Sequence, residues 1–160
     1  MLDVHGRRTA MDGYSKLRRG RLSSPGQIYL VTFTTASRHP LFQDSAPACC
    51  VCRAITDPRL WYQSRLLAWV LMPDHWHGLI EVGGLDHLSM VVQRLKTNSA
   101  RRLRMEHPMI ARVWERGFHD RALRSEAALK PAARYLVANP LRAGLAKHFG
   151  DYPYWNSIWL

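Results

Sequence analysis

The chain has 160 residues, 47% of them hydrophobic, a length and composition that predict a single compact domain. Its 23 lysine and arginine residues outnumber 12 acidic ones, which gives a formal net charge of +11 and a pI near 10.3. No segment approaches the ~18 consecutive apolar residues of a membrane span, and no apolar stretch follows the N-terminal arginines, so we expect a cytoplasmic protein with no membrane partner.

The excess positive charge indicates a polyanionic partner. Arginine far outnumbers lysine, and the guanidinium group can bind phosphate through two parallel hydrogen bonds. Nucleic acid is therefore favoured over a lipid surface, although a basic pI alone leaves other roles open. The three cysteines, Cys49, Cys50 and Cys52, are too close together for a disulfide framework, which fits a reducing compartment. Because the C-x-x-C has no second ligand pair, we expect thiols buried on a helix, with a structural zinc as the alternative.

The first part of the chain divides into an arm and a β-rich region. Residues 1–26 are polar and basic, and we predict an N-terminal arm that binds DNA through Arg18, Arg19 and Arg21. β-Branched and aromatic runs, and the turn residues that bound them, then predict a strand over 28–35, a helix over 46–56, a strand over 65–71 and a strand over 75–82. Pro73 and Asp74 supply the turn of a hairpin between the last two strands.

The second part of the chain alternates helix, strand and helix. Asp86 is expected to cap a helix that keeps its apolar residues on one face. Its other face carries Arg94, Lys96, Arg101 and Arg104, which either contact nucleic acid or are only solvated. A fourth strand is predicted within 113–125, and a last helix from about Glu126 to Asn139.

The order β-α-β-β-α-β with one further helix predicts an α+β fold of the ferredoxin-like split βαβ type. We expect one antiparallel sheet with helices on one face and the other face free for a ligand. The domain should span 27–148, after the arm of 1–26 and before a C-terminal tail of 149–160.

Two residue patterns carry candidate chemistry. His75 and His77 are two residues apart on a predicted strand, so both imidazoles point the same way and can reach one divalent metal. On the last helix, Tyr135 lies in a stripe with Ala128 and Ala132, whose small side chains leave room around the phenol. By themselves these patterns leave a chance histidine pair and a core tyrosine as alternatives.

Two longer segments resemble a known family. Residues 135–145, which include Tyr135, Asn139 and Arg142, resemble the Y-x-x-x-N-P-x-R-A-G-L segment of the REP-associated tyrosine transposases. Residues 70–80 resemble their V-M-P-N/D-H-x-H-x-L segment, with Trp76 as the hydrophobic residue of the HUH motif. Weaker similarity to the family's N-terminal start and to its D-x-x-x-R segment extends the resemblance to about residues 18–145.

The resemblance implies a ferredoxin-like HUH nuclease that cuts and joins single-stranded or hairpin DNA of repetitive extragenic palindromes. It implies that His75 and His77 bind Mg²⁺ or Mn²⁺, that Tyr135 is the nucleophile, and that Asn139 completes the metal coordination. Arg142, in the same segment, is counted among the DNA-binding residues. It further implies a monomer associated with the bacterial nucleoid.

Two other functions remain open at this point. A domesticated transposase could bind hairpin DNA without cutting it, but it would not require His75, His77 and Tyr135 together. A basic RNA-binding protein with the same fold would instead expose aromatic residues on its central strands, for which Tyr29 and Trp69 are the candidates.

Overall fold

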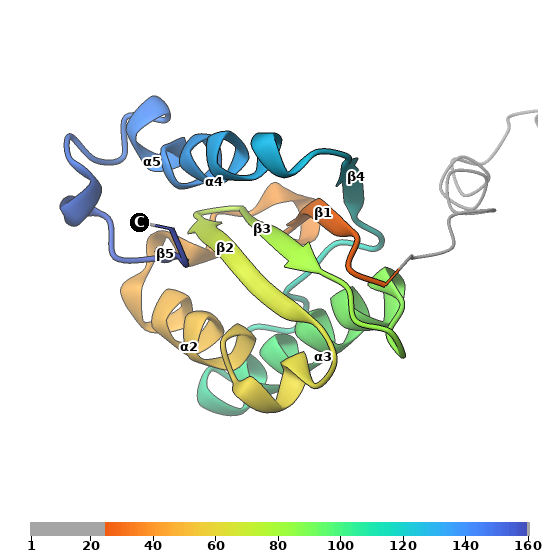
Figure 1. Ribbon diagram of the computed structural model, residues 1–160. Coiled ribbons are helices and arrows are strands. Elements are labelled where there is room, and N and C mark those ends of the chain that lie inside the picture. The colour runs from red at the N-terminus through yellow and green to blue at the C-terminus, as the bar shows by residue number, and fades with distance from the viewer. Residues whose placement is uncertain (1–24, 160) are drawn as a thin grey trace, which may run out of the picture.

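The computed structural model describes residues 25–159, which build one antiparallel sheet of five strands in the order β4-β1-β3-β2-β5 (Figure 1). The strands, in chain order, are β1 (Ile28–Thr34), β2 (Arg65–Met72), β3 (His75–Glu81), β4 (His119–Leu123) and β5 (Trp155–Ser157). The α-helices are α2 (Ser45–Ile55), α3 (Leu88–Glu106), α4 (Leu129–Val137) and the single turn α5 (Asn139–Arg142). Short 3-10 turns η1 (Ala36–Arg38), η2 (Leu41–Gln43), η3 (Pro58–Trp61), η4 (Glu126–Ala128) and η5 (Phe149–Asp151) connect them.

The predicted fold class is confirmed, because the first four strands and first two of these helices follow each other as β-α-β-β-α-β. β2 and β3 form the expected hairpin around Pro73 and Asp74. β1 pairs with β3 on one side and with β4 on the other, and β3 also pairs with β2. β1 and β3 therefore lie in the interior of the sheet.

The two faces of the sheet carry separate apolar clusters. On one face, alternate residues of the central strands, such as Val31, Phe33 and Trp76, pack against α2 and α3. On the other face, Ala133, Leu136 and Val137 of α4 pack against β2 and β3. Figure 1 shows α2 and α3 together on one side of the sheet and α4 on the opposite side. The face that we expected to be free is therefore covered by α4 over β2, and Ile28, Leu30 and Leu123 of β1 and β4 pack against the same cluster.

The buried indole of Trp76 shapes the centre of β3. Trp76 is fully buried and stacks on Phe33, with 4.9 Å between ring centroids. Its ring also lies over Gly78, where an added Cβ would come within 2.0 Å of the indole. Because Gly78 has no side chain, the indole of Trp76 has room to lie over the strand at this position.

Several local predictions were wrong. Asp86 does not cap α3, which begins after His87; its carboxylate instead accepts hydrogen bonds from Arg94 and Ser64. The predicted tail of 149–160 returns to the sheet, where residues 155–157 pair with β2 as β5. Of the three thiols that we expected to be buried, Cys50 is buried, Cys52 is partly buried and only Cys49 is exposed.

The aromatic residues that an RNA-binding sheet would expose are in the core. Tyr29 is 6% exposed and Trp69 is 8% exposed, and both belong to the cluster that packs under α2 and α3. This arrangement contradicts the RNA-binding interpretation, which needs them on an open surface. Among the described helices, none is long and apolar enough to cross a lipid bilayer.

We predict that Gly78→Ala destabilises the fold because the new methyl group must displace the indole of Trp76. Overpacking of this kind costs about 1–3 kcal/mol. Urea denaturation should therefore show a lower midpoint for Gly78→Ala, whereas Gly84→Ala, where an added Cβ meets no atom within 4 Å, should leave the midpoint nearly unchanged. Equal midpoints for the two variants would contradict this account.

Candidate active site

His75 and His77 lie on β3 and point to the α4 side of the sheet. Their ring centroids are 4.4 Å apart, and neither side chain is fully exposed. The alternation of the strand produces this arrangement, since Trp76 between them enters the core on the other face.

One ring nitrogen of each histidine is held by a neighbouring oxygen. A hydrogen bond of 2.5 Å joins Nδ1 of His75 to Oδ1 of Asp74, and one of 2.6 Å joins Nδ1 of His77 to Oγ1 of Thr32. The carboxylate of Asp74 can only accept, so Nδ1 of His75 carries the hydrogen and its Nε2 keeps a lone pair. The hydroxyl of Thr32 can donate or accept, so it orients the ring of His77 in either tautomer. The two rings lie on the same side of β3, where both can face one metal ion.

The surroundings of His77 keep its ring neutral. Burial, the nearby His75 and the positive charges of Arg38 and Arg142 lower the pKa of His77 to about 3. A neutral imidazole is the form that binds a metal. The same two arginines provide positive charge around the pair, which suits a phosphodiester as the ligand.

Arg38 reaches the histidines from a loop that sequence analysis did not single out. Its Nη1 donates to Oδ2 of Asp74 at 3.1 Å, and with the bond from His75 it holds the pKa of Asp74 below the usual value, although partial burial opposes this. Ser37 and Arg38 both adopt left-handed backbone conformations, with φ of 54° and 57°. Such conformations persist only where the surroundings fix them. Here buried Thr35 bonds to the backbone oxygens of His39 and Asp74.

Tyr135 lies on α4 with 64% of its surface exposed. The guanidinium of Arg142 stacks on its ring, with Cζ 3.8 Å from the ring centroid. Arg142 in turn donates from Nη2 to Oδ1 of Asn139. Asn139 begins α5 after a break at Ala138, so it is not on the same helix as Tyr135. Tyr135, Asn139 and Arg142 thus form one connected group, and the charge of Arg142 also acts on His77.

The donor atoms of this site fit a divalent metal. Two imidazoles whose Nδ1 atoms are already hydrogen-bonded are typical ligands of Mn²⁺ or Zn²⁺, and Mg²⁺ accepts them when oxygen donors fill the other positions. Over residues 25–159, no group of three His, Cys, Asp or Glu side chains could hold a metal ion. The remaining donors would therefore be oxygens of an amide, a phosphate or water.

The predicted DNA-binding residues of α3 lie away from this site. α3 packs on the face of the sheet opposite to His75 and His77. Arg94 forms a two-pronged ion pair with buried Asp86, at 2.7 and 2.8 Å, and Lys96 donates to the backbone oxygens of Glu115 and Gly117. Their charges have partners within the fold, and the assignment of Arg94 and Lys96 to DNA stays a prediction.

The other predicted DNA-binding residues have mixed surroundings. Arg101 and Arg104 are exposed or partly exposed on α3, in the layer remote from Tyr135. Arg142 lies at the candidate site. Arg18, Arg19 and Arg21 fall outside the described residues. Thr32, Arg38 and Asp74 were missed; only Asp74, which precedes His75 in a turn, gave a signal in the sequence.

Comparison with known proteins identifies the family. The family model described as "Transposase IS200 like" matches residues 24–136, which is most of the chain. The chain belongs to the IS200-like transposase family. No match was found among curated proteins.

Solved structures share the fold of this IS200-like transposase. A REP-associated tyrosine transposase bound to a REP hairpin superimposes with a TM-score of 0.69 and 20% identity, over 84% of this chain and 79% of that one. A Deinococcus radiodurans protein classed provisionally as a transposase gives 0.52 and 22%, over 74% and 94%. A bacterial tRNA(His) guanylyltransferase-like protein gives 0.50 and 15%, over 83% and 63%. Because that protein has a different activity, function must be argued from the site.

The lowered pKa of His77 predicts a specific pH dependence of stability. Between pH 6.5 and about 3 the unfolded transposase binds a proton at His77 that the folded one does not, so stability falls as the pH falls below 6.5. In the presence of chelator, going from pH 7.5 to 5 should cost the wild type about 2 kcal/mol more than His77→Gln. Urea denaturation at the two pH values measures this difference, and parallel losses would show that His77 titrates normally.

Proposed function

We propose that this transposase is a metal-dependent endonuclease and strand transferase for single-stranded DNA. Its substrates are hairpin-forming repetitive extragenic palindromes, and it acts through a 5′-phosphotyrosine intermediate. The observation that carries the proposal is the grouping of an exposed tyrosine, a stacked arginine and two oriented imidazoles on one face of the sheet.

His75 and His77 would hold the metal through Nε2, with Asn139 as the proposed third ligand. A bound Mg²⁺ or Mn²⁺ neutralises the charge of the scissile phosphodiester and polarises its P–O bond. Asp74 and Thr32 would keep the two rings oriented, and Arg38 would keep Asp74 ionised.

Tyr135 would attack the phosphorus atom through its phenolic oxygen. The new bond joins that oxygen to phosphorus, and the bond from phosphorus to the 3′ oxygen breaks, which releases a 3′-hydroxyl and leaves a 5′-phosphotyrosine. Arg142 would hold the ring of Tyr135 in place and attract the phosphodiester, since its guanidinium lies against that ring. The phosphodiester energy is kept in the covalent bond, so a new 3′-hydroxyl can reverse the step without ATP.

Hairpin DNA as partner is supported by the similar REP-associated transposase, which was solved with a REP hairpin. The net charge of +11 supports a nucleic acid partner independently. We further propose that the protein acts as a monomer in the cytoplasm, associated with the nucleoid.

The alternative is a domesticated protein that binds hairpin DNA without cutting it. Such a protein needs no exposed nucleophile. In this chain Tyr135 is exposed and stacks on Arg142, whose charge also acts on His77. Formation of a covalent adduct therefore distinguishes the two functions.

We predict that Tyr135→Phe abolishes the adduct with a labelled hairpin oligonucleotide while hairpin affinity changes little. The substitution removes only the attacking oxygen, and the side chain is largely exposed, so folding should not suffer. Denaturing electrophoresis with Mn²⁺ detects the adduct. Tyr62→Phe, at a position that is 82% exposed, is the matched control and should keep full activity. An adduct in Tyr135→Phe would remove Tyr135 as the nucleophile.

The metal assignment predicts that His75→Ala and His77→Ala each lower the cleavage rate by orders of magnitude, because the phosphate charge is then poorly neutralised. Mn²⁺ affinity, measured by titration calorimetry, should fall in both. His87→Ala, which removes an exposed histidine at the start of α3, should change neither quantity. Full wild-type cleavage in chelator would refute the assignment.

The arm predicts a change in salt dependence. Deleting residues 1–24 should weaken binding to all DNA sequences about equally, since phosphate contacts do not read bases. Each lost contact to single-stranded DNA lowers the slope of log affinity against log salt by ~0.7, so losing Arg18, Arg19 and Arg21 should lower it by about 2. Replacing these three arginines by alanine in the full chain should reproduce most of the effect. An unchanged slope would leave the arm without a role in binding.

A further inference from the structure

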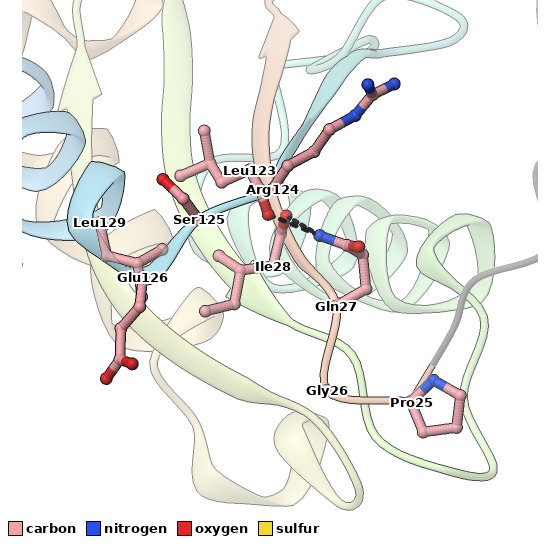
Figure 2. Close-up of a pocket in the computed structure, with 9 residues that line it drawn as sticks. All are labelled: Pro25, Gly26, Gln27, Ile28, Leu123, Arg124, Ser125, Glu126 and Leu129. Atoms are coloured by element: carbon pink, nitrogen blue, oxygen red, sulfur yellow. Dashed lines mark hydrogen bonds between the residues drawn. The ribbon is translucent and has the colours of Figure 1, made fainter.

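A cavity lies on the same face of the sheet as the proposed catalytic group. It has a volume of about 420 Å³, within the range of small-ligand sites. Figure 2 shows it where the start of β1 meets the end of β4 and the turn into α4. Its lining includes Gln27, Ile28, Leu123, Ser125, Glu126 and Leu129. None of these residues has a role in the cleavage step proposed above.

The strand register relates the cavity to the histidines. Ile28 and Leu123 are paired neighbours and pack on the apolar cluster under α4, which places them on the face of His77. Thr32, the partner of His77, is four residues further along β1, or about 13 Å at ~3.3 Å per residue. A stacked DNA strand advances about 3.4 Å per nucleotide, so at most about four nucleotides separate the two places.

The lining offers an apolar wall and hydrogen-bond acceptors. Ile28, Leu123 and Leu129 present aliphatic surface against which a flat ring can lie. The Nε2 hydrogens of Gln27 are used by the backbone oxygens of Ile28 and Leu123, so only its carbonyl oxygen is left for a ligand. The carboxylate of Glu126 also accepts hydrogen bonds and repels phosphate. These features suit a base with amino donors and do not suit the sugar-phosphate chain.

The phosphates have a separate place on the rim. In Figure 2 the side chains of Arg124 and Glu126 point in opposite directions, so the guanidinium lies outside the cavity. Arg121 lies two residues before the end of β4 and is exposed. It pairs with Leu30, which places it on the face of His77. A strand with its backbone along Arg121 could turn one base inward toward Glu126.

We propose that this cavity binds one unpaired base of the DNA substrate that carries an exocyclic amino group, within about four nucleotides of the phosphodiester attacked by Tyr135. The inference rests on the proposed function for its substrate class. It adds a base-reading subsite, with Glu126 as acceptor and Arg121 as the neighbouring phosphate contact.

Disulfide crosslinking tests the position directly. The protein is the full chain with Ser125→Cys, with Cys49→Ser to remove an exposed thiol and Tyr135→Phe to keep the DNA intact. The probe is a stem-loop with a single-stranded extension of about six nucleotides, longer than the span along the sheet, placed on either side of the stem. One extension cytosine at a time carries an alkyl thiol on N4.

Crosslinking with Ser125→Cys should concentrate at one or two adjacent positions. It should be at least ~10-fold faster there than with Ser89→Cys, because only a base held in the cavity brings the two sulfur atoms together. Ser89 is exposed on α3, in the other layer, and serves as the matched control. Crosslinks spread evenly along the extension, or no faster than in the control, would overturn the proposal.

Base selectivity tests the role of Glu126. At the crosslinking position, wild type should bind cytosine or adenine about 5- to 10-fold more tightly than thymine, which lacks an amino group. Glu126→Gln should remove this preference, whereas Glu106→Gln, which neutralises an exposed carboxylate on α3, should keep it. Equal selectivity in the two variants would refute Glu126 as the reader.

The outcomes separate this inference from the proposed function. If Tyr135 forms the adduct but neither crosslinking nor base preference is localised, the subsite is wrong and cleavage stands. If crosslinking is localised but no adduct forms with intact Tyr135, the cavity binds DNA in a protein that does not cut it.

Discussion

The two-residue alternation of β3 is the constraint on which the rest of the structure depends. One strand sends Trp76 and Ile80 into the core under α2 and α3 and sends His75 and His77 to the opposite face. Because the anchoring side chains are fully buried, the imidazoles are held by the core of the domain. β3 also lies between β1 and β2, so Thr32 can reach His77 from the neighbouring strand.

The electrostatics of the site follow from what covers this face. α4 packs over β2, and α5 brings Arg142 against Tyr135 and near His77. Arg38 arrives from the other end of β1, fixed by the strained turn at η1. Burial and two cations keep His77 neutral, so the face combines a neutral imidazole with positive charge suited to DNA. β1 connects Thr32, beside His77, with Ile28 at the cavity beside Glu126.

Much of the fold could be predicted because strand and helix periods are local properties of the sequence. The order of the first six elements, the hairpin at Pro73 and the position of His75 and His77 on one face all follow from residue periodicity and turn residues. Partner choice is not local. The side chains of Arg94 and Lys96 looked like a basic face, yet Asp86 and two backbone oxygens from the 115–117 segment take up their charges.

The sequence by itself determined the chemical groups of this protein: a histidine pair of one orientation, a tyrosine on the last helix, and a strongly basic composition. It also determined the family, through motifs that depend only on residue order. The tertiary structure alone decided which groups meet, because Arg38, Asp74 and Arg142 come from segments far apart along the chain. It also placed residues 155–157 at the sheet edge, since a three-residue strand has too weak a local pattern and is stabilised by its pairing with β2.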